Sequence, residues 1–288
     1  MQTAAVVLLC LTALLFTVVA PRLMAPQTIF RRCPGPALLV WQGTALAGVT
    51  AALLAAPVAA WSLGRDHLEI IIVAGVLSAT MLARLLLSAH QVGTSLRALR
   101  RRHREWVDLL AGDDEATGAK ILAHPGPTAY CIPGDSHHVV LSRGTLEALH
   151  PDELAAVLAH ERAHLEARHD LVLEFFGVLH HAVPTPLRCA AALLEVRLLV
   201  EALADRAAIR RVGARPLARA LVQMSPAPQS THAFTAPDLG AISGTEQTRV
   251  RLLLIAEAAT PHRAQAVAML ALAVTALATP FLFVVLGV

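Results

Sequence analysis

Four long segments with almost no charged residues limit the fold of this 288-residue chain more than any other feature. Each segment has the roughly 17–25 residues that a helix needs to cross the hydrocarbon core of a bilayer. Helices of soluble proteins normally keep a polar face over such a length, and these segments have none. The chain is therefore predicted to be mainly α-helical and integral to a membrane, with four transmembrane helices. The segments are residues 3–20, 37–61, 68–89 and 264–288.

The distribution of arginine between the loops predicts the orientation of these helices. Arg22, Arg31 and Arg32 follow the first segment, and five arginines follow the third within SLRALRRRHRE. Cytoplasmic loops carry the excess of basic residues, so the N-terminus and the C-terminus are predicted to lie outside. The first segment has no basic residue before it, as a signal peptide would, and is expected to remain as an anchor.

The same pattern divides the chain into three parts. Residues 1–90 are predicted to form a membrane domain with three helices, residues 91–263 a cytoplasmic domain, and residues 264–288 the fourth transmembrane helix. The basic run directly follows a transmembrane helix and lacks interleaved aromatic residues apart from Trp106. Anionic lipid headgroups therefore suit it better than nucleic acid. The lipid bilayer is an expected partner, and no direct nucleic-acid binding is expected.

Two short apolar stretches in the cytoplasmic part predict a small β-hairpin. AYCI (Ala129–Ile132) and HVVLS (His138–Ser142) are separated by residues that begin Pro-Gly-Asp, which favour a turn. The preceding stretch AGDDEATG, residues 111–118, is polar and predicts a loop.

The stretch LAAVLAHERAHLEARHD, residues 154–170, predicts an amphipathic helix with two histidines one turn apart. Pro151 suits the first helical position, and the two acidic residues after it favour the positive end of the helix dipole. At 100° per residue, Val157 and three leucines share one face, and His160 and His164 lie together at its edge. A metal ion bound there would be held rigidly and partly dehydrated.

Histidines at positions i and i+4 of a helix can ligate one zinc ion. Glu161, next to the first histidine, cannot reach the same metal comfortably. It can take a proton from a water that the metal activates and return it to a leaving amine. This is the machinery of amide hydrolysis. A surface helix rich in histidine and glutamate is the alternative interpretation, since the chain has 14 histidines.

A catalytic zinc ion needs a third protein ligand, and Glu201 is the best candidate. A helix is predicted from a Thr185 cap to a stop at Gly213, and it places Asp205 one turn after Glu201 on the same face. Asp205 could then accept a hydrogen bond from a ligand histidine and fix its tautomer. A solvated stripe paired with nearby arginines is the alternative. Glu174 is the strongest rival for the ligand position, and the other rivals are Glu166, His169, Asp170, Glu195 and Asp205.

Four stretches of the chain resemble the BlaR/MecR-type membrane zinc metallopeptidases, which are gluzincin relatives of the HtpX-like proteases. They are AYCIPG, VVLSRGTLEAL, PDELAAVLAHERAHLEARHD and EALADRAA. The resemblance implies a gluzincin-like cytoplasmic domain with three transmembrane helices before it and a fourth after it, and one bound zinc ion. It also implies that His160, His164 and Glu201 bind the zinc, that Glu161 is the catalytic base and that Asp205 supports a ligand.

The resemblance also suggests where a substrate would bind. The strand containing Ala129, Tyr130 and Cys131 would be a sheet edge that pairs with an extended substrate through main-chain hydrogen bonds.

Two later stretches, STHAF and TRVRLL, are similar to segments of HtpX-like enzymes, although Ala233 stands where those have proline. His232 is therefore a candidate for stabilising the oxyanion of the tetrahedral intermediate, and Arg249 is a second, weaker candidate. The remaining histidines of this region, His169, His180 and His181, are expected to be structural or on the surface.

These features predict an integral-membrane zinc endopeptidase with its active site at the cytoplasmic face of the cell membrane. By resemblance, the expected protein substrate is a cytoplasmic transcriptional repressor of the winged-helix type. An HtpX-like quality-control protease is one alternative, and a signalling scaffold that binds a partner without cutting it is another. Antibiotic-sensing relatives carry an extracellular penicillin-binding domain after the fourth helix. This sequence ends at Val288, so sensing of a β-lactam through such a domain is not expected.

Overall fold

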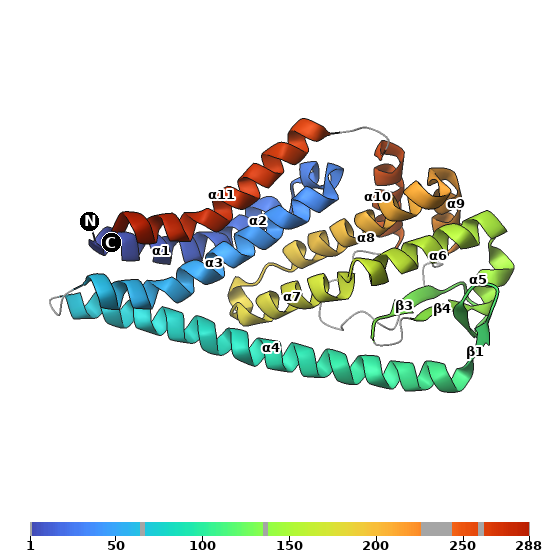
Figure 1. The fold of residues 1–288 in the computed structure, drawn as a ribbon, viewed down its shortest axis with the longest axis horizontal. Coiled ribbons are helices and arrows are strands. Elements are labelled where there is room, and N and C mark those ends of the chain that lie inside the picture. The colour runs from blue at the N-terminus through green and yellow to red at the C-terminus, as the bar shows by residue number, and fades with distance from the viewer. Residues whose placement is uncertain (1, 64–66, 135–137, 226–243, 259–261, 288) are drawn as a thin grey trace. The chain divides into compact units, whose positions relative to one another are not determined.

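Most of the described chain is helical in the computed structural model (Figure 1). The structure describes residues 2–63, 67–134, 138–225, 244–258 and 262–287. The chain forms two compact units, each assembled from separate segments. The first unit consists of residues 1–92, 176–196 and 262–288, and the second of residues 93–175 and 197–261.

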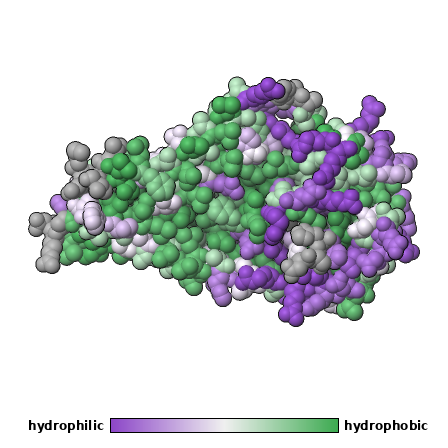
Figure 2. All heavy atoms as spheres, in the orientation of Figure 1, coloured by the Kyte–Doolittle hydropathy of each residue, from purple (hydrophilic) through white to green (hydrophobic). Residues whose placement is uncertain are grey.

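The first unit is built on four helices that are long and apolar enough to cross a membrane, as the four segments predict. Val73, Leu86 and Val274 on these helices are 64%, 62% and 68% exposed, which suits contact with lipid chains. The first helix comprises α1 (Gln2–Leu14), a π-helical segment (Leu15–Val19) and α2 (Ala20–Met24); the others are α3 (Pro34–Ser62), α4 (Leu68–Leu110) and α11 (Arg263–Gly287). Figure 2 shows a largely hydrophobic surface over α1, α3 and α11.

Small residues on α3 let its neighbours α1 and α11 pack closely against it. A Cβ atom on Gly43 would lie 2.8 Å from the main-chain oxygen of Ala273, so this crossing of α3 and α11 requires glycine. Four alanines at helical spacing on α3 are fully buried: Ala47, Ala51, Ala55 and Ala59.

Residues 176–196 belong to the first unit, whereas the sequence places them in the cytoplasmic domain. They comprise the second half of α7 (His169–Ala182), a 3₁₀ turn (Thr185–Leu187) and the start of α8 (Ala190–Val212). The segment is too short to span a membrane. Its length and charge therefore do not predict that it packs against the membrane helices.

Polar contacts fasten this segment within the first unit. The Ser88 hydroxyl donates to the carbonyl of Val178 at 2.7 Å, and Arg31 donates three hydrogen bonds of 2.7–3.1 Å to the carboxylate of Glu195. The prediction that Thr185 caps α8 is wrong, because Thr185 lies in the 3₁₀ turn.

The second unit contains a four-stranded sheet with the strand order β1-β2-β4-β3. Strands β3 and β4 are antiparallel, which confirms the predicted hairpin. The predicted polar loop is wrong in its first half, because these residues form β1, which pairs with β2. The Asp114 carboxylate accepts hydrogen bonds from the main chain and the hydroxyl of Thr117, and this tight turn returns the chain for pairing. The strands are β1 (Ala111–Asp114), β2 (Ala119–Leu122), β3 (Ala129–Ile132) and β4 (His138–Ser142).

The helices of the second unit are α5 (Arg143–Ala148), α6 (Pro151–Glu166), α9 (Ala214–Gln223) and α10 (Gly244–Glu257), with the first half of α7 and the later part of α8. Buried residues of α6 pack on the sheet, and others pack on α8, α9 and α10. The predicted stop of α8 is confirmed, since the helix ends before Gly213, whose φ of 98° favours glycine. These contacts fix α6 and α8, which carry the residues of the candidate site.

Candidate metal centre

His160 and His164 lie one turn apart on α6, with their Nε2 atoms 3.1 Å apart. The helix begins at Pro151 as predicted, and the Glu153 carboxylate accepts the main-chain N–H of His150 at 3.1 Å. His160 is buried and His164 is half-buried, so the pair borders the core.

Helix α8 brings Glu201 to the two histidines. Its Oε2 atom lies 3.4 Å from Nε2 of His160, and its Oε1 atom lies 3.5 Å from Nε2 of His164. One potential ligand atom from each of the three side chains lies within 4.8 Å of the others. The structure therefore brings together the three residues that the sequence selects as metal ligands.

These atoms lie close enough together for one metal ion to bind all three side chains. Zinc–ligand bonds of about 2.0–2.1 Å at tetrahedral angles place the ligand atoms about 3.3–3.4 Å apart. The two Nε2 atoms are 3.1 Å apart; Oε2 of Glu201 lies 3.4 Å from Nε2 of His160, and Oε1 lies 3.5 Å from Nε2 of His164. With one ligand atom taken from each residue, the three atoms lie within 4.8 Å of one another. Two imidazoles and a carboxylate form a donor set of catalytic zinc sites, and three protein ligands leave the fourth position open.

Asp205 contacts the opposite side of the His160 ring. Its Oδ1 atom lies 3.0 Å from Nδ1 of His160, so an N–H there would donate to the carboxylate and leave Nε2 free for a metal. Burial opposes the charged imidazole, but the hydrogen bonds with Asp205 and Glu201 outweigh it and raise the pKa of His160 to about 9. Metal binding at His160 would therefore release a proton.

His169 contacts His164 in the same way, which the sequence does not indicate. Arg168 has a φ of 49°, a left-handed conformation that breaks the chain between α6 and α7 and turns His169 back. The Nδ1 atoms of His164 and His169 are 3.0 Å apart. Burial and the neighbouring His164 lower the pKa of His169 to about 4, so a neutral His169 can accept an N–H from His164. Of the two expected settings, structural or on the surface, His169 has the structural one, since it is buried.

Arg251 of α10 contacts both carboxylates. Its guanidinium donates hydrogen bonds of 2.5 and 2.9 Å to Asp205 and lies 3.0 Å from Oε2 of Glu201. Burial opposes ionisation of Glu201, but Arg251 and the histidines hold its pKa below the usual range. The sequence singles out Arg249 instead, which is 73% exposed and pairs with Glu246. Helical spacing distinguishes the two arginines. Arg251 lies one turn before the buried Ile255 and shares its face of α10, whereas Arg249 does not.

Glu161 lies near Cys131 of β3, and each of the two side chains affects the pKa of the other. Burial raises the pKa of the Glu161 carboxyl, and burial followed by the charge of Glu161 raises the pKa of the Cys131 thiol. Cys131 therefore stays protonated and can donate to Glu161. A carboxylate whose affinity for protons is raised suits general acid–base chemistry.

Strand β3 lies at an edge of the sheet, and α6 packs against it. Among the described residues, β4 is the sole strand that pairs with β3, through registers such as Tyr130 opposite Val140. The predicted substrate strand is thus an edge strand beside the helix that carries the histidines. His232 lies outside the described residues.

The rival carboxylates make ion pairs elsewhere. Asp170 and Glu174 both lie near Arg100, at 3.7 and 3.4 Å. Glu166 pairs with Arg211 at 2.7 Å, and Glu195 pairs with Arg31 in the first unit. Among the described residues, Glu201 is the carboxylate that completes a group with the two histidines.

Comparison with known proteins identifies the type of domain. The family described as Peptidase family M48 matches residues 99–246, about half of the chain. The matched region includes the sheet, the two histidines, Glu161, Glu201 and Asp205, but it ends before Arg251. Neither the curated proteins nor the solved structures contain a match.

Proposed function

Because the chain belongs to peptidase family M48, a family of metallopeptidases, we propose that it is an integral-membrane zinc endopeptidase. The observation that carries the proposal is the group of His160, His164 and Glu201, whose potential ligand atoms lie within 4.8 Å of one another and form a donor set of catalytic zinc sites. Four apolar helices support the membrane assignment.

In this proposal His160, His164 and Glu201 hold one zinc ion. Bound zinc would supply Lewis-acid chemistry, polarising the scissile carbonyl and lowering the pKa of water. Asp205 and His169 would keep the two imidazoles oriented with Nε2 toward the metal, through the contacts at their Nδ1 atoms.

Glu161 would act as the general base and then as the general acid. It would take a proton from the attacking water and deliver it to the amine that leaves. The carboxyl is held in a buried setting that raises its pKa, which favours taking the proton from the water.

The edge of β3 is the proposed substrate site. An extended peptide could add to this edge through main-chain hydrogen bonds, with Ala129, Tyr130 and Cys131 as its neighbours. The contact of Cys131 with Glu161 supports this location, because a peptide on β3 would lie close to the proposed base.

The arginine-rich loops support a cytoplasmic active site, with the N-terminus and C-terminus outside. Reporter fusions after Asp66 and after Asp114 should give opposite locations. The same location from both fusions would contradict this orientation.

A cytoplasmic repressor of the winged-helix type is the proposed substrate, and its support is the sequence resemblance to the repressor-cleaving membrane peptidases. Incubation of the purified enzyme with such a repressor should give two discrete fragments. Digestion to many small fragments, with equal digestion of unrelated unfolded proteins, would indicate a quality-control protease.

Removal of the metal tests the peptidase assignment itself. The full-length protein in detergent should cleave unfolded casein, lose this activity with phenanthroline, and regain it when zinc is returned. Magnesium should not restore it, because the site offers imidazole donors. Cleavage that continues unchanged in the chelator would contradict the proposal.

A further inference from the structure

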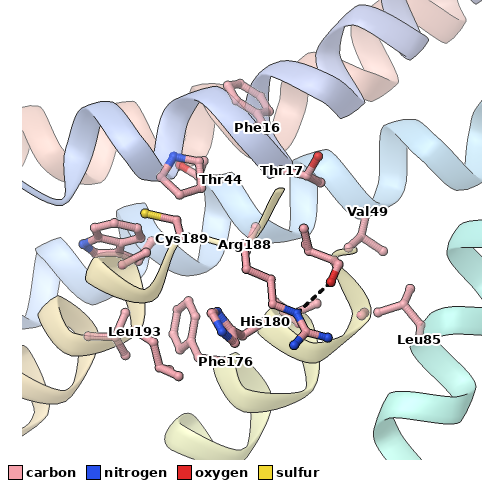
Figure 3. Close-up of a pocket in the computed structure, with 18 of the residues that line it drawn as sticks. Phe16, Thr17, Thr44, Val49, Leu85, Phe176, His180, Arg188, Cys189 and Leu193 are labelled. Carbon is pink, nitrogen blue, oxygen red and sulfur yellow. Dashed lines mark hydrogen bonds between the residues drawn. The ribbon is translucent and has the colours of Figure 1, made fainter. Parts of the chain in front are cut away.

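The first unit has an apolar cavity that none of the proposed catalytic residues lines (Figure 3). Its volume is about 90 Å³, and its walls come from the first membrane helix, α3, α4, α7 and the start of α8. Phe16, Leu85, Phe176 and Leu193 supply large apolar groups. Apolar cavities of roughly 150 Å³ can hold a benzene-sized ligand, so this one has room for part of a hydrocarbon chain.

Trp41, which lines this cavity, has a buried polar atom without a partner among the described residues. Trp41 is 3% exposed, and its indole Nε1 makes no hydrogen bond with any described residue. A buried N–H without an acceptor costs free energy, and buried donors are normally satisfied. Trp41 lies about two turns inside the end of α3 that begins at Pro34, a depth at which lipid ester oxygens can be reached.

Three arginines surround the chain that connects α7 to α8, next to the cavity. Arg188 lines the cavity and donates to the carbonyls of Val183 at 2.9 Å and His181 at 3.0 Å; Figure 3 shows the first bond. Arg22 donates to the carbonyl of Leu187 at 2.9 Å. Arg84 donates to the carbonyl of Ala182, which also lines the cavity.

None of these three arginines pairs with a carboxylate of the described chain, because each contacts main-chain oxygens that carry no formal charge. The group therefore has three uncompensated positive charges beside an apolar cavity. Arg31, by contrast, is neutralised by Glu195. A ligand that complements the group must combine an apolar chain with an anionic head.

We propose that this cavity binds part of one acyl chain of an anionic phospholipid of the bilayer. The phosphate would lie against the guanidinium of Arg188 with Arg22 and Arg84 nearby, and an oxygen of the lipid would accept the N–H of Trp41. Residues of α7 and α8 form part of the wall, so the bound lipid would hold the 176–196 segment within the first unit.

Fluorescence of Trp41 tests the proposal. A full-length variant carrying Trp61→Phe and Trp106→Phe keeps Trp41 as its single tryptophan. It is reconstituted in phosphatidylcholine bilayers that contain increasing amounts of a phospholipid with brominated acyl chains, which quench tryptophan on contact. Brominated phosphatidylglycerol should quench Trp41 at a several-fold lower mole fraction than brominated phosphatidylcholine does. A variant that keeps Trp61 alone, which is 83% exposed, should respond equally to both lipids.

Two substitutions in the single-tryptophan variant locate the effect. Arg188→Gln should remove most of the preference for phosphatidylglycerol, whereas Arg263→Gln, which removes a charge from an exposed position at the start of α11, should leave it unchanged. Ala192→Phe fills the cavity and should protect Trp41 from both lipids. Native mass spectrometry of the detergent-purified protein should show one retained anionic phospholipid.

Equal quenching of Trp41 by the two lipids would overturn the proposal, as would unchanged quenching in the filled variant. Retention of a species with the mass of a free fatty acid would overturn the assignment to a phospholipid. None of these three results depends on peptidase activity.

Discussion

Helix α8 carries two carboxylates that each meet an arginine, Glu195 in the first unit and Glu201 in the second. The Glu195 carboxylate receives three hydrogen bonds from Arg31 and is buried, so its charge and its acceptor sites are used. Glu201 meets Arg251 through one oxygen and turns both oxygens toward histidine Nε2 atoms. The same residue type therefore acts as an anchor in one unit and as a potential ligand in the other.

The net charge of the groups around Glu195 also differs from that around Glu201. Arg31 and Glu195 cancel each other. In the second unit the carboxylates of Glu161, Glu201 and Asp205 face one guanidinium, that of Arg251, which leaves two negative charges when all are ionised. His160, whose pKa is raised to about 9, offsets one of these charges in the metal-free site and would lose its proton when a metal binds. A cluster with excess negative charge attracts a divalent cation, whereas an ion pair whose two charges cancel does not.

The largest expected effect comes from exchanging these carboxylates for alanine one at a time. Glu201→Ala should lose bound zinc and peptidase activity together, because two imidazoles alone make an incomplete site. Glu195→Ala should keep about one zinc per chain but lower the stability of the protein by about 3 kcal/mol, since it leaves Arg31 without its partner. Zinc content and thermal denaturation of both variants test the comparison; a fully loaded Glu201→Ala protein would show that another carboxylate is the ligand.

A second experiment separates holding the metal from using it. Glu161→Gln keeps the shape of the side chain but removes its ability to accept a proton. Zinc content should stay near that of the unchanged protein, while cleavage should fall by about 10²–10⁴-fold. Near-normal cleavage by this variant would mean that Glu161 is not the base.

Smaller effects are expected from the residues that contact the far sides of the imidazoles. Asp205→Ala should weaken zinc binding by roughly 10–100-fold, the usual cost of removing such a partner. His169→Phe should weaken it less, because a neutral imidazole is a weaker acceptor than a carboxylate. Competition with a chelator of known affinity measures both. Equal affinities in the two variants and the unchanged protein would remove both residues from the site.

The last comparison, which ends with the smallest expected effect, concerns two neighbouring arginines. Arg251→Gln should destabilise the zinc-free protein by a few kcal/mol, because it leaves Asp205 and Glu201 without a positive charge. Zinc should offset part of this loss by supplying a positive charge. Arg249→Gln should change stability by about 0.5 kcal/mol or less, since Arg249 is exposed. Unfolding with and without zinc provides the measurement, and equal behaviour of the two variants would contradict the placement of Arg251.

Some features follow from short-range rules and were predictable from the sequence. Helix-forming segments without charge predict the four apolar helices, since length and composition suffice. The spacing of His160 and His164 predicts their proximity, because four residues make about one turn of any α-helix. The hairpin of β3 and β4 is local as well.

Other features depend on contacts between distant parts of the chain. The polarity of residues 111–114 indicates a loop, but pairing with β2 makes them a strand. Hydrophobicity alone does not show that residues 176–196 pack in the first unit, where Glu195 finds Arg31.

The sequence by itself determined the membrane helices, the histidine pair with its neighbouring Glu161, and Glu201 with Asp205 as candidates, because helical periodicity acts over a few residues. Only the tertiary structure decided which carboxylate meets the histidines, since Glu195 and Glu201 lie on one helix and differ in what surrounds them. The tertiary structure also decided the contacts of His169 and Arg251. One depends on a left-handed residue at Arg168, and the other on the packing of α10 against α6, α8 and α9, which no local pattern specifies.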